Sequence, residues 1–215
     1  MLPITIYRRK VVFTLLVAVA LLLVGELAVL MCKHLFGHSY VYGLVPLFDF
    51  YEEGNLPTWF NALEFVLAAL LAALVATCEK RLLLPGFKYW TGLTLIFLFF
   101  SADEAAQIHE ALIEPLRKFS FTSYFYYAWV MPYAIITVVI VAFYLPFVFK
   151  LSGQVKNRFL LSAILYVAAA LGLEMVEGHL AALGQAGNLT FDLLVMFEEL
   201  TEMLSLIILI DGLLI

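Results

Sequence analysis

Six apolar runs of about twenty residues leave this chain very few ways to fold. A run of that length matches the hydrocarbon core of a bilayer, and inside it the backbone satisfies its own polar groups by forming helix. Hydrophobic residues make up 65% of the chain and charged ones 13%, whereas a soluble domain is about half apolar. We therefore predict an all-α, single-domain membrane protein over residues 1–215, a bundle of six transmembrane helices at about 11–31, 58–78, 90–110, 124–149, 159–180 and 191–210.

The basic residues predict how these spans are oriented. The N-terminal segment, the 79–89 connection and the 150–158 connection hold three Lys or Arg each, which is nine of the chain's twelve; the other connections hold Lys33, Arg117 and Lys118. Cytoplasmic loops carry the excess of Lys and Arg, so both termini are predicted to be cytoplasmic, in a bacterial inner membrane. The first apolar run is too long for a signal peptide, and we expect it to be a true span.

Acidic side chains inside the predicted spans point to a functional site. Charges in such places are costly, and intramembrane ionisable groups mark functional sites by default. Counted inward from the outer end of each span at about 1.5 Å per residue, five helices bring a carboxylate to a layer roughly 10 Å below the outer, periplasmic boundary. The predicted spans hold no Lys or Arg, and ten of the acids in them are candidates for this site: Glu26, Glu64, Asp103, Glu104, Glu110, Glu174, Glu177, Glu198, Glu199 and Glu202.

Helical phase predicts that most of these acids face one another. At 100° per residue, Asp103, Gln107 and Glu110 fall on one stripe of a helix that would run to residue 110. The acids of the fifth and sixth spans also share one face of their own helix. His109 and His179 point away from these stripes. Carboxylates therefore dominate the predicted site.

So many carboxylates cannot all stay ionised at low dielectric, and they must be protonated, neutralised by a cation or reached by water. Carboxylates and histidine that project inward from several helices are the ligands of bundle-core metal centres. Oxygen-rich ligands suit magnesium, calcium or manganese, and an added imidazole admits zinc or iron. We predict a divalent metal cation site, open to metal-assisted chemistry, with the candidate ligands Asp103, Glu104, His109, Glu110, Glu174, Glu177, Glu198, Glu199 and Glu202.

Other functions fit the same acids. A chain of carboxylates could carry protons or cations, as in a proton-coupled or cation transporter, although the inner half of the spans holds almost no polar residue. A small chain in the lipid bilayer could also be an accessory subunit of a larger membrane complex, or a homo-oligomer. Protonated acids that only link helices are the structural alternative, and it is strongest for Glu26 or Glu64 alone.

No motif assigns a reaction to the chain. It lacks a phosphate-binding glycine loop, a nucleophile elbow, paired Cys-x-x-Cys and His-Glu-x-x-His. The spacing Glu-x-x-His that is typical of di-iron bundles is also absent. Whether the protein is an enzyme therefore stays open, and we expect no nucleic-acid partner.

Four segments, FDFYEEGNLPTWF, SADEAAQIHE, LGLEM and EELTEM, resemble a family of uncharacterised bacterial multi-pass membrane proteins. Those proteins combine Gly-Asn-x-Pro-Thr-Trp, Ser-x-Asp-Glu with a downstream His-Glu, and Glu-Glu-x-x-Glu-Met. The chain departs from the pattern at Ala102, where Leu is usual, and at Glu64, where the family is apolar. The resemblance supplies no activity but implies a shared site at Asn55, Pro57, Thr58, Trp59, Asp103, Glu104, His109, Glu110, Glu174, Glu198, Glu199 and Glu202.

Overall fold

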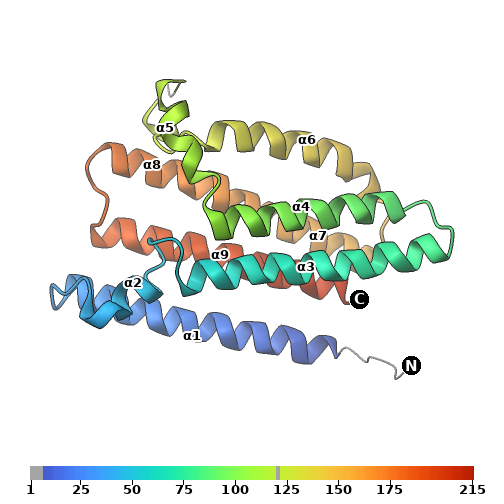
Figure 1. Cartoon of the computed structure of the whole chain (residues 1–215), viewed down its shortest axis with the longest axis horizontal. Helices are drawn as coiled ribbons and strands as arrows, with labels where there is room; N and C mark the ends of the chain where they lie inside the picture. The colour runs from blue at the N-terminus through green and yellow to red at the C-terminus, as the bar shows by residue number, and fades with distance from the viewer. Residues whose placement is uncertain (1–6, 120–121) are drawn as a thin grey trace.

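Long antiparallel helices make up the protein (Figure 1). The computed structural model describes residues 7–119 and 122–215, and within these ranges it contains helices and connections but no strand. Short helical turns fill two connections: η1 (Val41–Gly43) and α2 (Leu44–Phe48) in the first, and η2 (Glu110–Leu112), α5 (Ile113–Leu116), η3 (Arg117–Phe119) and η4 (Ser123–Phe125) in the other. The long elements are α1 (Arg8–His34), α3 (Leu56–Arg81), α4 (Phe87–Ala106), α6 (Val130–Val148), the continuous run of α7 (Gly153–Val167), η5 (Ala168–Leu173) and α8 (Glu174–Ala182), and α9 (Leu189–Leu213).

The long helices alternate in direction along the chain. The start of α1 and the end of α9 lie at one end of the bundle, which we call the terminal end (Figure 1). The opposite end carries α2 and α5, and we call it the loop end. Helix α3 packs along α4, while α9 contacts α1, α3 and α7 and is the central helix. By contrast, α6 makes few contacts with the other helices.

Four of the helical runs are long and apolar enough to cross a membrane: Arg8–His34, Leu56–Arg81, Val130–Val148 and Gly153–Ala182. Length and composition therefore support a membrane protein. Helix α9 carries more acids than any of these runs, and it holds Asp192, Glu198, Glu199, Glu202 and Asp211.

The observed helices differ from the predicted spans mainly at their ends. Helix α3 begins at Leu56 because Asn55 is its N-cap and accepts the Thr58 N–H, with Pro57 in the first turn. Thr58 therefore lies inside the helix. The fourth predicted span starts too early: η4 occupies residues 123–125, and α6 begins only at Val130.

The run from α7 to α8 contains a stretch of π-helix, Ala168–Leu173, immediately before Glu174. A π turn closes i→i+5 hydrogen bonds and is often found at functional sites. The stretch changes the angular position of every residue that follows it. It therefore determines the direction in which the acids of α8 project.

The terminal half of the bundle is closed by apolar side chains. Buried members of this cluster include Phe65, Leu71, Trp90, Phe97, Phe159, Leu206 and Ile210. At the very end, Arg8 binds Asp211 through its Nε and Nη2 atoms at 2.6 and 2.8 Å, and Arg158 Nε lies 3.0 Å from the same carboxylate. These contacts tie α1, α7 and α9 together below the apolar cluster.

Candidate functional site

Three carboxylates from two helices meet inside the bundle. Glu174 and Glu177 lie one turn apart on α8, and Glu198 faces them from α9. Each offers an oxygen within 4.8 Å of the other two, and we call these residues the carboxylate triad. Trp129 donates its indole N–H to Glu174 Oε1 at 2.9 Å, which fixes one arm of the triad.

Burial makes this triad electrostatically costly. Glu177 is 3% exposed and Glu198 is 6% exposed, and in the described part of the chain no Lys or Arg forms an ion pair with the triad. Glu177 and Glu198 share a side-chain hydrogen bond, which two carboxyl groups can form only when one holds a proton. Even so, Glu177 Oε1 is buried without a hydrogen-bond partner in the described part of the chain. A bound cation is the other way to neutralise such a group.

Asn61 links two more of the predicted acids to this region. Its Nδ2 atom donates to Glu104 Oε1 at 3.3 Å and to Glu202 Oε2 at 3.2 Å, so it joins α3, α4 and α9. The side chain is fully buried, and its Oδ1 atom has no hydrogen-bond partner among the described residues. Glu199 lies within electrostatic reach of Glu202 and Glu104.

The predicted stripe of Asp103, Gln107 and Glu110 is wrong, because α4 ends at Ala106. Gln107 has φ 54° and ψ 42°, a left-handed conformation that terminates the helix. The Asp103 carboxylate then accepts the backbone N–H of His109 at 2.9 Å. This turn carries His109 back toward Asp103, and Glu110 is exposed.

His109 lies among acids just beyond the end of α4. Its Nε2 atom is 3.2 Å from Glu53 Oε1 and its Nδ1 atom is 3.6 Å from Asp103 Oδ1. Burial by itself would lower the pKa of His109, but hydrogen bonds to Asp103 and Glu53 raise it to about 11. The imidazole is therefore a half-buried positive charge beside the acidic layer. Its ring packs on Trp129 with 4.8 Å between centroids, which connects it to the triad.

A second group of possible ligand atoms lies at the loop end. Glu53, His109 and Glu110 each offer one atom within 4.8 Å of the others. Partial desolvation by the neighbouring side chains, followed by repulsion from Glu53, raises the pKa of Glu110. Together these three residues form a rim at the loop end of the acidic region.

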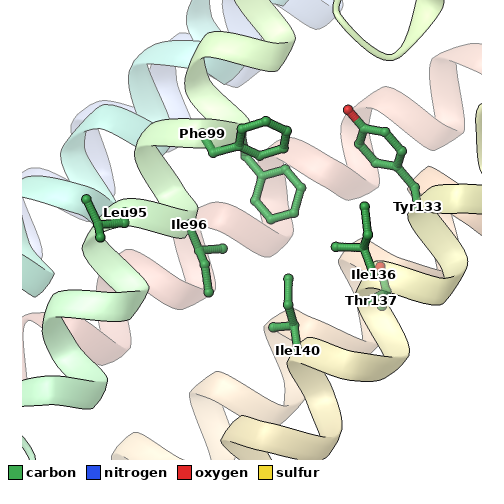
Figure 2. Close-up of a pocket in the computed structure, with 8 residues that line it drawn as sticks. Leu95, Ile96, Phe99, Tyr133, Ile136, Thr137 and Ile140 are labelled. Atoms are coloured by element: carbon green, nitrogen blue, oxygen red, sulfur yellow. The ribbon is translucent and has the colours of Figure 1, made fainter. Parts of the chain in front are cut away.

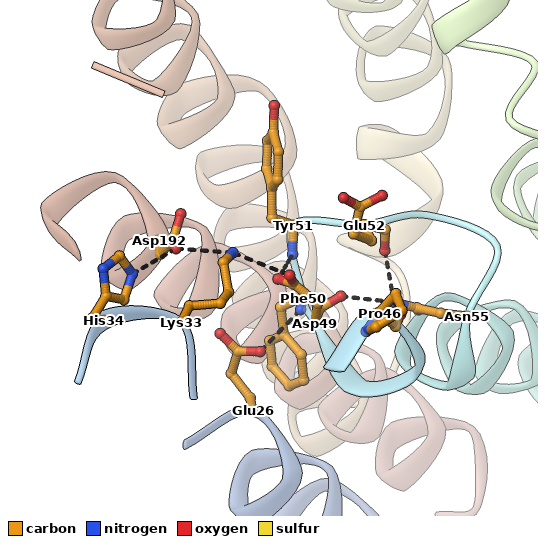
Figure 3. A network of polar contacts seen from close by, with 10 residues as sticks. All are labelled: Glu26, Lys33, His34, Pro46, Asp49, Phe50, Tyr51, Glu52, Asn55 and Asp192. Carbon is orange, nitrogen blue, oxygen red and sulfur yellow. Dashed lines mark hydrogen bonds and ion pairs between the residues drawn. The ribbon is translucent and has the colours of Figure 1, made fainter. Parts of the chain in front are cut away.

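A separate polar network joins α1, the 49–55 loop and α9 (Figure 3). Lys33 Nζ lies 3.0 Å from both Asp49 Oδ2 and Asp192 Oδ2, and His34 Nε2 lies 2.8 Å from Asp192 Oδ2. Glu26 belongs here, because its Oε2 atom accepts the Phe50 N–H at 3.0 Å. No sequence pattern pairs Lys33 with Asp192, and α1 brings Lys33 there by continuing to His34.

Two other acidic or basic candidates lie apart from the triad. His179 Nδ1 is 2.6 Å from Ser123 Oγ, and its ring stacks on Tyr124. Glu64 is 1% exposed, and neither carboxyl oxygen has a hydrogen-bond partner among the described residues. Its isolation fits a protonated acid that packs between helices.

The remaining predicted ligands are thus brought to one polar interior by contacts between α3, α4, α8 and α9. Trp129 and Asn61 are the bridging residues that sequence reasoning missed. Neither is acidic, and their partners are 45 residues away for Trp129, and 43 and 141 residues away for Asn61.

One family model matches the chain, over residues 11–215, and it is described as a domain of unknown function, DUF8692. No curated protein matches the chain. No solved structure matches it either.

Proposed function

The chain belongs to the DUF8692 family, and we propose that it is a six-span membrane protein that binds a divalent cation at the carboxylate triad. The observation that carries this proposal is the triad itself. Three carboxylates have oxygens within 4.8 Å of one another, two of them are buried and Glu174 is half-buried, and Glu177 Oε1 lacks a hydrogen-bond partner among the described residues. A divalent cation would satisfy that oxygen and replace the proton that Glu177 and Glu198 share.

The membrane arrangement is the second part of the proposal. Four helical runs meet the requirements for a span, and we add α4 and the central α9 as two further spans. The acids of α9 can stay within the bilayer because α1, α3 and α7 pack around it. The basic residues Arg8, Arg9 and Lys10 mark the terminal end as cytoplasmic, so the triad would open toward the outer side of a bacterial inner membrane.

The donor set favours a hard cation. The triad supplies carboxylate oxygens, which suit magnesium, calcium or manganese better than zinc. We assign His109 the role of a counter-charge, since both of its ring nitrogens face carboxylates. A cation at the triad could also activate water for hydrolysis, and the exposed acids at the rim would then be nearest to an incoming substrate.

The packing supports binding over transport. The apolar cluster that includes Phe65, Leu71 and Phe97 fills the bundle between the acids and the terminal end. A pathway for ions across the membrane would need polar groups there. Glu64 lies next to this cluster without a hydrogen-bond partner among the described residues, and a single acid there does not provide a continuous path.

Elemental analysis of the purified protein tests the proposal. Wild type, Glu177→Gln and Glu114→Gln would each be equilibrated with magnesium, calcium or manganese and then freed of excess metal. Glu114 is a matched control, since its side chain is 77% exposed and pairs only with Arg117. We expect near-stoichiometric metal in wild type and in Glu114→Gln, and little in Glu177→Gln. Sub-stoichiometric metal in all three proteins would overturn the proposal.

A further inference from the structure

An apolar groove separates α4 from α6 (Figure 2). Leu95, Ile96 and Phe99 line one wall, and Ile136 and Ile140 line the other. The cavity has a volume of about 200 Å³. The groove lies between two places where α4 and α6 touch: Tyr89 stacks on Phe147 on one side of it, and the Tyr133 hydroxyl donates to Asp103 on the other.

The chemistry of the walls selects the kind of molecule that can occupy the groove. Helix α6 contains no charged residue, and the polar atoms in the lining side chains are the hydroxyls of Thr137 and Tyr133. The groove is open to the outside, where Leu95 is 63% exposed and Ile136 is 44% exposed. In a membrane that surface faces hydrocarbon rather than water. An uncharged alkyl chain is therefore complementary to both the walls and the mouth.

Size distinguishes a lipid chain from a protein helix. At about 30 Å³ for each water molecule, the groove holds roughly seven water volumes. A helix with its side chains is about 10–12 Å across and could insert only a single side chain. A segment of acyl chain fits along the groove, whose α6 wall from Tyr133 to Ile140 rises about 10 Å.

Tyr133 connects the groove to the acidic site. Its ring lines the groove, and its hydroxyl donates to Asp103 Oδ1 at 2.8 Å. The same ring packs against Trp129 at 5.1 Å between centroids and lies 6.4 Å from His109. A molecule whose chain lies in the groove would thus hold its polar end near Asp103, on the loop-end side of the bilayer.

We propose that the groove between α4 and α6 binds an acyl chain of an outer-leaflet phospholipid, so that bilayer lipid is the class of molecule brought to the acidic site. This inference rests on the proposed function for its membrane orientation. It adds a lateral route from the bilayer, between two helices, and it assigns Tyr133 to the junction of the groove and the polar interior.

Photo-crosslinking in lipid nanodiscs tests the inference. The probe is a phosphatidylcholine that carries a diazirine within one acyl chain, and labelled residues are identified by mass spectrometry. We expect labels to concentrate on Phe99, Ile136 and Ile140. Thr137→Trp fills the groove and should reduce labelling there at least five-fold. Val138→Trp adds the same side chain at a position that is 67% exposed outside the groove lining, and it should leave the labels unchanged.

The outcomes separate this inference from the proposed function. Labels that persist in Glu177→Gln, which should lose its metal, support the groove independently of the cation. Equal labelling all around α6, with no effect of Thr137→Trp, overturns the inference and leaves the metal result standing. Crosslinks to a second copy of the chain at these residues, in place of lipid, also overturn it.

Discussion

Lys33 offers the most direct test of the electrostatic argument. Its ammonium lies 3.0 Å from the carboxylates of both Asp49 and Asp192, which are buried. At that distance and an effective dielectric of about 20, each attraction amounts to roughly 5 kcal/mol before desolvation. Desolvation offsets much of it, yet removing one partner of a buried pair costs about 3–5 kcal/mol because the other charge stays buried. We expect Lys33→Met to lower the free energy of unfolding by about that amount.

Reversible unfolding in detergent, followed by tryptophan fluorescence, measures this effect. Lys33→Met combined with Asp192→Asn removes one of the stranded charges, so the double variant should be more stable than the sum of the two single variants predicts. Lys33→Arg keeps the charge and should retain most of the stability. If Lys33→Met unfolds within about 0.5 kcal/mol of wild type, as an ordinary surface substitution does, the network contributes no stability and the argument fails.

Two further substitutions test the ends of the helices that hold the site. Asn55 donates to the carbonyls of Pro46, Asp49 and Glu52 and caps α3, so Asn55→Ala should lower the free energy of unfolding by about 2–3 kcal/mol. Asn55→Asp keeps only the cap, and its stability should lie between those of wild type and Asn55→Ala. Thermal unfolding of the three proteins measures the difference. His109 has a pKa raised to about 11, so its contribution to stability is complete below about pH 6.5 and is lost as pH rises through 11. Wild type should therefore lose about 1.4 kcal/mol per pH unit between roughly pH 7 and 9 relative to His109→Gln, and parallel pH profiles for the two proteins would contradict the assignment.

The length of the apolar runs was enough to locate the long helices along the chain. Each predicted span overlaps an observed helix because a run of about twenty apolar residues has no other way to satisfy its backbone in lipid. The ends were less predictable, since α1 continues through charged residues to His34. Lys33 forms its ion pair with Asp192 only because the fold places that part of α9 beside the end of α1.

Depth and helical phase brought the right acids together on α8 and α9, but they failed at the end of α4. The stripe through Glu110 assumed a regular helix, and nothing in the letters Gln107-Ile108 indicates a left-handed residue. The bridging roles of Asn61 and Trp129 depend on contacts between distant segments, and periodicity within one helix carries no information about such contacts. A single sequence therefore predicts the depth of the acidic residues along the helices better than it predicts the hydrogen bonds among them.

The π-helical stretch Ala168–Leu173 gives the acids of α8 a single workable register. Removing one residue from that stretch would rotate everything beyond it by about 100°. Glu174 and Glu177 would then swing away from Glu198, although both ends of the helix could stay in place. Six residues without a charged side chain thereby hold the geometry of the carboxylates. The number of residues in this stretch is as strict a requirement as the acids themselves.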